Sequence, residues 1–448
     1  MSSKAIKMII PIALIIILWF IPAPTGLTQN GWHFLAIFFA VVVGLILEPV
    51  PAALVGFTGI SVIALLGLMG SPKDGITWAL SGFSNSVIWL IFAAFMFALG
   101  YKKTGLGRRV SLIMIKYMGK SSLGLGYAVA FSDLVLAPFM PSNTARSGGS
   151  VYPVAYISWV AIATTCVTSS MFLTALAPNL LAVDLITKST GHAISWVEWS
   201  SVMLPLMIPL FLLTPWLTYV VYPPTQKKSP EAPAWATEEL KTLGAITFKE
   251  YLMAGLATVA LVLWIFGKEF GVDSTTVAIA IVAVMVLTNV ITWDDLISNK
   301  AAFDVLIWFS SLVAMASGLQ KVGVLAWIGT NTQAMLSGMS PTTLIISLLV
   351  LFFLLHYFFA SVTAHVTALI PIFMAIAVSL LTPEQIVPFT IILAGSLGVM
   401  GIITPYGTGP SPIWYGAGYI SQARWWALGA IFGALYLGVM ILGAFIFI

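Results

Sequence analysis

The sequence predicts an all-α polytopic membrane protein with about 11 transmembrane helices, two re-entrant hairpins and an inverted-topology repeat. Hydrophobic residues make up 60% of the 448-residue chain and charged residues 8%, whereas soluble chains average about 25% charged residues. A short polar motif also occurs twice inside hydrophobic sequence, as Ser142-Asn143-Thr144-Ala145-Arg146 and as Ser361-Val362-Thr363-Ala364-His365, 219 positions apart. Polar groups at membrane depth are tolerated where they line a cavity, so a duplicated polar motif indicates two repeats that share a site.

Apolar blocks long enough to cross about 30 Å of hydrocarbon predict the spanning helices. In chain order they lie at about 8–21, 32–48, 51–69, 83–101, 157–186, 200–222, 251–268, 272–292, 303–319, 387–417 and 425–447. We expect the first block to be a retained helix, because Pro22 and Pro24 follow it instead of a small-residue cleavage motif. A short amphipathic helix is expected at about 106–119.

Two segments contain too many helix breakers or polar residues for a simple crossing. Residues 121–154 include Asp133, Pro138, Pro141 and Arg146, and residues 341–379 surround the second polar motif. In each, two apolar arms flank a polar tip. This pattern predicts a re-entrant hairpin, because polar backbone at membrane depth must be buried in protein or line a cavity.

The repeat extends beyond the hairpins. Gly100, Lys103 and Gly105 match Gly318, Lys321 and Gly323 at an offset of 218, and both sets end a long helix and begin a short amphipathic one. Pro178-Asn179 matches Pro405-Tyr406 at an offset of 227. Each proline lies in an apolar helix, where it removes a backbone hydrogen bond and predicts a break.

Six segments follow from this pattern. They are N-terminal scaffold helices (1–82), a first transport repeat (83–186), a scaffold helix with a cytoplasmic connector (187–250), scaffold helices of the second half (251–302), a second transport repeat (303–417) and a C-terminal helix (418–448). With a cytoplasmic N-terminus, 14 basic residues fall on the cytoplasmic side and 4 on the outer side, as the positive-inside rule requires. This arrangement places the hairpins on opposite sides, which makes the halves inverted repeats.

The predicted site is selective for anions. Half-helix N-termini at the hairpin tips attract carboxylates. Arg146 adds a permanent cation and His365 one that pH can switch. The candidate substrate-binding residues are Ser142, Asn143, Thr144, Arg146, Pro178, Asn179, Ser361, Thr363, His365, Thr404, Pro405, Tyr406 and Gly407. No catalytic residue, metal ligand or cofactor is expected.

Structural roles compete with these assignments. Ser142 and Thr144 would also suit helix capping, Arg146 could extend to the cytoplasmic surface, and His365 could make a structural hydrogen bond. For His356, which has no counterpart in the first half, the structural role is favoured. Other residues are expected to pack or end helices: Asp133 to pair with a cation or cap the hairpin entry, Glu48 to end a helix, and Cys166 to pack inertly.

At these residues the chain resembles the divalent anion/sodium symporter family. The runs Leu47–Pro51, Ala137–Arg146, Phe359–His365 and Thr404–Pro410 are most similar to those of bacterial citrate/succinate and tartrate/succinate antiporters, and also to plastid 2-oxoglutarate/malate translocators. The resemblance covers essentially the whole chain. It implies a homodimer in which scaffold helices support a moving transport domain, that is, an elevator mechanism.

The chain departs from the sodium-coupled members of this family at three positions. Val362 replaces the second asparagine, and Arg146 and His365 stand where those members have small neutral residues. A cation in a would-be sodium pocket opposes Na⁺ binding, which favours sodium-independent exchange. The antiporters also have polar loops after the third helix and after the first hairpin, and here both connections are short.

The sequence therefore predicts a secondary transporter of the bacterial inner membrane that exchanges di- or tricarboxylates of the succinate, malate, 2-oxoglutarate, tartrate or citrate class. Its partners would be the substrate, the lipid bilayer and a second copy of the chain, and not nucleic acid. The main alternative is a sodium- or proton-coupled dicarboxylate symporter. A channel remains a further alternative. An intramembrane serine protease using Ser361 and His365 is disfavoured, because the first copy has arginine in place of the general base.

Overall fold

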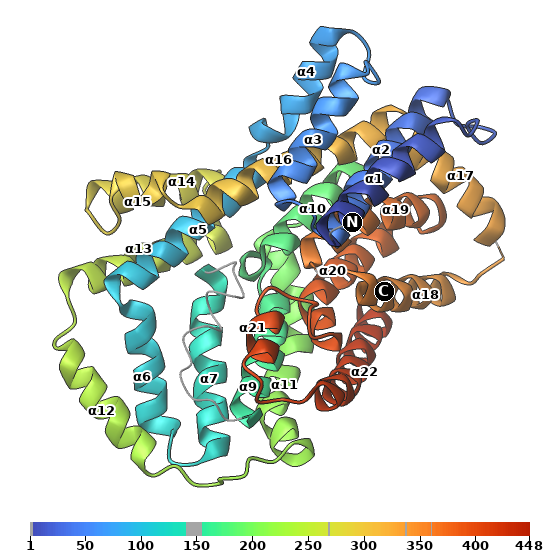
Figure 1. Ribbon diagram of the computed structural model, residues 1–448. Helices are drawn as coiled ribbons and strands as arrows, with labels where there is room; N and C mark the ends of the chain where they lie inside the picture. Colours follow the sequence, from blue (N-terminus) through green and yellow to red (C-terminus); the bar gives the residue numbers. More distant parts are fainter. Residues whose placement is uncertain (1–2, 140–154, 268, 337, 360) are drawn as a thin grey trace.

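The computed structural model describes residues 3–139, 155–267, 269–336, 338–359 and 361–448, and within these ranges the regular elements are helices (Figure 1). The elements of the first half are α1 (Ser3–Trp19), α2 (Gln29–Leu47), α3 (Ala52–Leu65), α4 (Pro72–Leu80), η1 (Ser81–Ser84), α5 (Ser86–Thr104), α6 (Leu106–Met118), α7 (Ser122–Leu136), η2 (Ala137–Phe139), α9 (Ala155–Met171), η3 (Leu173–Ala175), α10 (Ala177–Thr190) and α11 (Trp196–Val221). The later elements are α12 (Glu231–Leu243), α13 (Phe248–Phe266), α14 (Ser274–Leu287), α15 (Trp293–Ile297), α16 (Lys300–Lys321), α17 (Val324–Leu336), α18 (Pro341–Leu355), η4 (His356–Phe358), α19 (Val362–Leu380), α20 (Pro383–Val399), η5 (Met400–Ile403), α21 (Ser411–Gly416) and α22 (Gln422–Phe447).

The protein is an all-α polytopic membrane protein, as predicted. In the described part of the chain, 10 helical segments are long and apolar enough to cross a membrane, and four shorter apolar helices accompany them. Each block predicted to span contains helix in the structure, and the blocks at 157–186 and 387–417 are interrupted by the predicted breaks. The 10 long segments include α7, α18 and α19, which the sequence assigns to hairpin arms.

The two halves repeat the same run of elements. Helices α6 and α17 each contain 13 residues and lie 218 positions apart. Helices α7 and α18 each contain 15 residues, are followed directly by a 3₁₀ turn, and lie 219 positions apart. Gly105 and Gly323 precede α6 and α17 with φ angles of +80° and +82°, a backbone region that favours glycine. The repeat is therefore present in the fold, whereas its inverted topology stays a prediction.

Both predicted helix breaks are present. Helix α9 ends at Met171, and α10 resumes at Ala177 with Pro178 in its first turn, where the missing N–H of proline costs no hydrogen bond. In the second half, α20 and η5 end at Ile403, and the chain is not α-helical again until Ser411. The second break is therefore the longer and more irregular one.

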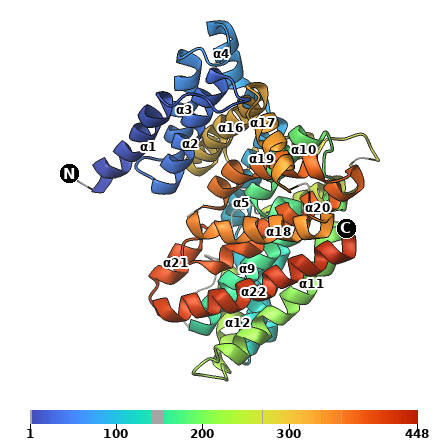
Figure 2. The same ribbon diagram turned by 90° about the vertical axis from the view of Figure 1, so that its right-hand side faces the viewer.

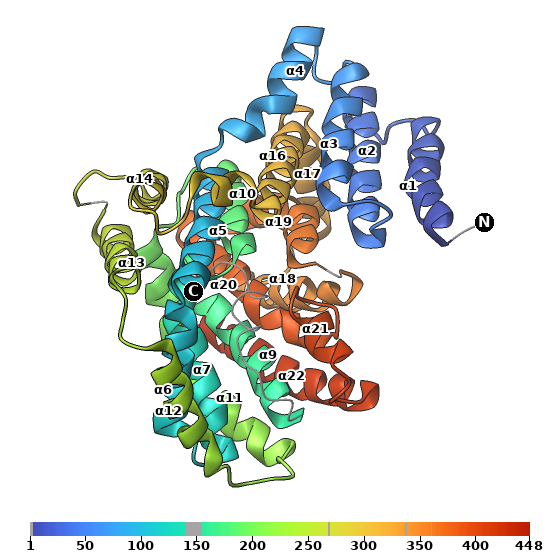
Figure 3. The ribbon, with the colours of Figure 1, turned by 60° about the vertical axis from the view of Figure 1, so that its left-hand side comes forward.

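The polar connector between α11 and α13 contains a helix, α12, that was not expected from the sequence. Helix α12 packs against α6, and the two lie side by side at one end of the molecule (Figure 3). Arg108 of α6 and Glu239 of α12 form an ion pair, while Arg109 of α6 forms a second pair with Glu250 at the start of α13. An isolated β-bridge joins Ser121 to Lys228. The connector is thus attached to the first repeat along much of its length.

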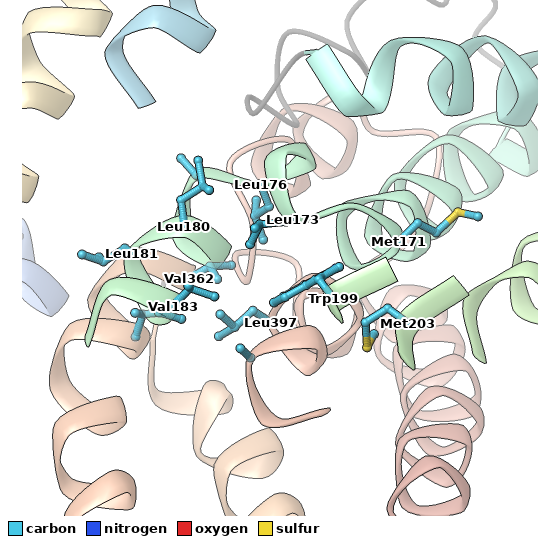
Figure 4. Close-up of a cluster of buried hydrophobic side chains, with 14 of the residues drawn as sticks. Met171, Leu173, Leu176, Leu180, Leu181, Val183, Trp199, Met203, Val362 and Leu397 are labelled. Carbon is cyan, nitrogen blue, oxygen red and sulfur yellow. The ribbon is translucent and has the colours of Figure 1, made fainter. Parts of the chain in front are cut away.

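Helices α1 to α4 gather at the end of the molecule opposite α12 (Figures 1 and 2). They share an apolar core with α16 and the start of α19. A larger core joins the two repeats: in Figure 4, Leu173 and Leu176 of the first break lie near Val362 of α19 and Leu397 of α20. The breaks of both halves are therefore held by one continuous packing unit.

Candidate functional site

The first copy of the polar motif lies outside the described residues. Ser142, Asn143, Thr144 and Arg146 all fall between residues 140 and 154. Their roles in substrate binding stay predictions, and the site is built here from the first break, the second hairpin and the second break.

Asn179 closes the first helix break. It follows Pro178 in the first turn of α10, and its Nδ2 donates hydrogen bonds to the carbonyl oxygens of Ser169 at 2.8 Å and Phe172 at 3.4 Å. These carbonyls lie at the end of α9, where helical acceptors lack intrahelical partners. Asn179 Oδ1 is buried without a hydrogen-bond partner among the described residues, so it can accept a further bond.

Ser361 caps the N-terminus of α19. Its Oγ accepts a hydrogen bond from the backbone N–H of Ala364 at 3.5 Å, which satisfies one of the free donors of the first turn. Thr363 follows in that turn and is buried. The second motif therefore opens a helix in the protein interior, and the N-terminus of that helix carries partial positive charge.

His365 lies one turn further along α19, enclosed by aromatic rings. Its ring centroid is 4.4 Å from that of Phe352, 5.0 Å from that of Phe359 and 5.1 Å from that of His356, each approached edge to face. His365 is fully buried, and neither ring nitrogen has a hydrogen-bond partner in the described part of the chain. The structural hydrogen bond weighed for His365 is thus absent from these residues.

The second break surrounds Gly407. Thr404 is fully buried, and its Oγ1 has no hydrogen-bond partner among the described residues. A Cβ built on Gly407 would lie 2.7 Å from Thr404 Oγ1 and 3.0 Å from His356 Nε2, which places both groups beside the Gly407 backbone and leaves no space for a side chain. The hydroxyl of Tyr406 donates to the carbonyl of Tyr357 in η4 at 3.0 Å.

His356 joins the second hairpin arm to this break. Its Nε2 lies 2.8 Å from the carbonyl oxygen of Gly407, to which it donates, and its Nδ1 has no partner in the described ranges. The structural role expected for His356 agrees with this bond. The sequence did not predict that His356 lies beside His365. The two residues belong to different helices, η4 and α19, and the turn between these helices brings them together.

The site residues form two groups. His365, Thr404, Tyr406 and Gly407 gather around η4, whereas Asn179 bonds only within the first break among the described residues. The two broken helices nevertheless touch, since the backbone N–H of Val399 donates to Ser170 Oγ at 3.1 Å. The span from α20 into η5 is also the most buried of the candidate spans, so the second break lies deep in the molecule.

The remaining sequence predictions concern packing. Asp133 is buried and accepts hydrogen bonds from Thr165 at 3.3 Å and from Thr168, which ties α7 to α9. Glu48 ends α2, as predicted. It adopts a left-handed conformation, and its N–H donates to the Gly44 carbonyl at 3.0 Å. Cys166 is fully buried in the larger core. Within the described ranges, no three His, Cys, Asp or Glu residues are placed to hold a metal ion.

The fold and the site define a polytopic membrane protein with two repeats, each with a broken helix. Buried polar groups that have no hydrogen-bond partner among the described residues lie at the second break. Two solved structures share the fold: the Alcanivorax borkumensis YdaH transporter (TM-score 0.59, 14% identity, covering 93% of this chain and 98% of that one) and Neisseria gonorrhoeae MtrF, of a class of antimetabolite efflux pumps (TM-score 0.55, 14% identity, covering 100% and 95%).

The sequence comparisons show the family. The chain belongs to the family described as the sodium:sulfate symporter transmembrane region, whose model matches residues 2–155 and 154–447. It is 47% identical to the L-tartrate/succinate antiporters of Shigella sonnei (strain Ss046) and Escherichia coli (strain K12), over 98% of this chain and 97% of each relative. Those alignments span 477 positions against 448 residues here, so both relatives contain residues without a counterpart in this chain.

Proposed function

We propose that this protein is a secondary active transporter that exchanges di- or tricarboxylates without sodium. The substrates would belong to the succinate, malate, 2-oxoglutarate, tartrate or citrate class. Relatives that are 47% identical over nearly their whole length are named L-tartrate/succinate antiporters, which supports both the substrate class and exchange. Because these relatives are transporters, an enzymatic role is disfavoured.

The observation that carries the proposal is a group of buried polar atoms without partners at the second break. Both ring nitrogens of His365 and Oγ1 of Thr404 lack a hydrogen-bond partner among the described residues. A buried polar group left unpaired costs about 1–3 kcal/mol, so several of them together favour a polar ligand that pairs with them. Substrate carboxylates supply acceptors, and the hydroxyl groups of malate or tartrate supply donors as well.

Charge selects an anion for this place. The N-terminus of α19 begins beside these atoms, and helix N-termini stabilise carboxylates through free N–H groups and the helix dipole. The N-terminus of α10 at the first break has no side-chain cap, so its helix dipole adds partial positive charge there. In this proposal Arg146 and His365 neutralise one carboxylate each, with Ser142, Asn143, Thr144, Ser361, Thr363 and Asn179 supplying neutral hydrogen bonds.

The positive charges of Arg146 and His365 also favour exchange over one-way transport. A site whose positive charge is fixed in the protein needs a bound anion to compensate it, whether the site faces inward or outward. Return of the empty carrier is then unfavourable, and return with a counter-substrate is favoured. The alternative, a sodium- or proton-coupled dicarboxylate symporter, is supported by the description of the family model and requires a cation site that Arg146 or His365 does not block.

The repeat supports alternating access. Two copies of the same elements, related by inverted topology, would present the site to each side of the membrane in turn. We propose an elevator motion in which the hairpins and broken helices move against the remaining helices of a homodimer. The excess of basic residues in the predicted cytoplasmic segments supports an inner-membrane location with a cytoplasmic N-terminus.

Counterflow in proteoliposomes tests this proposal. Vesicles preloaded with succinate are expected to take up labelled succinate, tartrate or malate rapidly, with equal rates in Na⁺ and K⁺ buffers, while empty vesicles take up little. A panel of unlabelled acids inside the vesicles would rank the substrates. Uptake into empty vesicles driven by a Na⁺ gradient, at the rate of preloaded ones, would instead establish symport.

A further inference from the structure

His356 is a fully buried polar residue to which the proposed function gives no role. We propose that it is a positioning residue for the carboxylate site: its Nε2–H holds the carbonyl oxygen of Gly407, so that this oxygen is withdrawn from the bound carboxylate and the hydroxyl of Thr404 stays available to it. The inference rests on the carboxylate exchange proposed above.

The geometry places this bond inside the site. His356 Nε2 and Gly407 O are 2.8 Å apart, and Thr404 Oγ1 lies on the same side of Gly407 as Nε2, since both would contact a Cβ built there. The Gly407 carbonyl carries partial negative charge. Without the imidazole donor, that oxygen would be a free acceptor next to the Thr404 hydroxyl, where it would either capture this hydroxyl or repel a carboxylate.

The tautomer of His356 favours positioning over direct carboxylate binding. Because Nε2 donates to Gly407, the neutral ring carries its proton on Nε2 and leaves Nδ1 as an acceptor. An acceptor nitrogen cannot hydrogen-bond to a carboxylate oxygen. The ring centroid of His365 lies 5.1 Å from that of His356, and neither nitrogen of His365 makes a hydrogen bond to a described residue. Of the two imidazoles, His365 is therefore the one that can donate to the substrate.

The bond from His356 to Gly407 is present in the second repeat in addition to a hydrogen bond that both repeats share. In the first half, Thr174 Oγ1 donates to the Pro138 carbonyl at 2.6 Å. In the second half, the Tyr406 hydroxyl donates to the carbonyl of Tyr357, the residue equivalent to Pro138 at the offset of 219. Each hairpin arm is thus attached to its broken helix at the same carbonyl. His356 corresponds to Ala137, so the additional bond belongs to the second half alone.

Three substitutions separate positioning from the other roles of a histidine. His356→Gln keeps a donor near the Nε2 position, His356→Asn keeps polar atoms only near the Nδ1 position, and His356→Leu keeps neither. Each full-length variant would be reconstituted in succinate-loaded vesicles, and KM and Vmax measured for labelled succinate and malate, together with the thermal unfolding midpoint. Tyr406→Phe serves as a matched control, because it removes the neighbouring bond between the same two segments.

We expect His356→Leu and His356→Asn to raise KM for both acids about tenfold, because one hydrogen bond to the charged carboxylate is lost. Vmax should change less than about twofold. His356→Gln should stay close to wild type, and Tyr406→Phe should raise KM less than His356→Leu. Rescue by asparagine and not glutamine, or a KM effect limited to malate, would overturn the proposal by assigning Nδ1 a direct contact.

Two further results would also overturn it. Equal effects of all His356 variants and Tyr406→Phe, in step with a lower unfolding midpoint, would show a purely structural bond. Unchanged KM in His356→Leu would refute the positioning role while wild-type exchange still stood. Wild-type vesicles that fail to exchange any dicarboxylate would refute the proposed function itself, which makes the two failures distinguishable.

Discussion

Removal of Arg109 is expected to destabilise the protein far more than removal of its neighbour Arg108. The Arg109 guanidinium contacts Glu250 through two bonds, Nε to Oε1 at 2.6 Å and Nη2 to Oε2 at 3.2 Å, and donates from Nη1 to the Gly244 carbonyl at 3.0 Å. The side chains of Arg109 and Glu250 are only 8% and 3% exposed. Loss of one partner of such a buried pair costs about 3–5 kcal/mol, because the other charge stays buried and unpaired.

The matched control lies one residue away. Arg108 pairs with Glu239, but their side chains are 62% and 29% exposed, and exposed pairs contribute about 0.2–1 kcal/mol. Unfolding of purified Arg109→Ala and Arg108→Ala by a denaturing detergent, in mild-detergent micelles, would measure both free energies. We expect a difference of at least about 2 kcal/mol between the two variants.

Two comparisons would refute this reasoning. Similar destabilisation by Arg109→Ala and Arg108→Ala would mean that burial of the first pair carries no energetic consequence. Glu250→Gln should be milder than Arg109→Ala. The arginine keeps the Gly244 and Ala245 carbonyls as acceptors, whereas among the described residues the Glu250 carboxylate keeps the Thr247 N–H alone. The opposite order would show that the carboxylate, and not the guanidinium, is the better satisfied partner.

Four further predictions concern the site and its support. Arg146→Ala should abolish exchange while leaving the amount of folded protein unchanged; normal transport would show that the arginine lies outside the site. Tartrate affinity should rise as the pH falls from about 8 to 5.5 in wild type and not in His365→Gln, because a bound carboxylate stabilises the protonated imidazole; identical profiles would exclude His365 as the titrating group. Gly82→Ala should reduce the yield of folded protein, since its Cβ would lie 1.8 Å from the Ser310 carbonyl oxygen, and a normal yield would contradict the close approach. Hydrogen bonding from the adjacent Lys103 lowers the pKa of the half-buried Asp295 carboxyl to about 2, so this pair stabilises the fold above about pH 4 and is lost only as the pH falls toward 2. Asp295→Asn should therefore leave the exchange profile between about pH 5.5 and 8 unchanged, and an altered profile would reveal a role beyond the pair.

Local signals were sufficient to predict most elements, although α4 and α12 were not predicted. Hydropathy and breaker residues predicted the spanning helices and both proline breaks, because backbone groups in a membrane must be satisfied within the segment itself. The re-entrant course of the hairpins stays a prediction. Helix α4 was missed although its signal is local: Ser71 and Asp74 form a capping box, with Pro72 between them at the start of the helix. Its nine residues are too few to form an apolar block that crosses a membrane.

The sequence by itself determined the membrane class, the two repeats and the residue types of the predicted site. Composition, periodicity and duplicated motifs depend only on the order of the residues along the chain. Tertiary structure decided which of these residues meet. His356 bonds to Gly407, 51 positions away, and Arg109 bonds to Glu250, 141 positions away. Neither side chain carries a local signal of its partner, since the direction of a side chain depends on how the helices pack, and packing is settled by the many apolar contacts of the shared core.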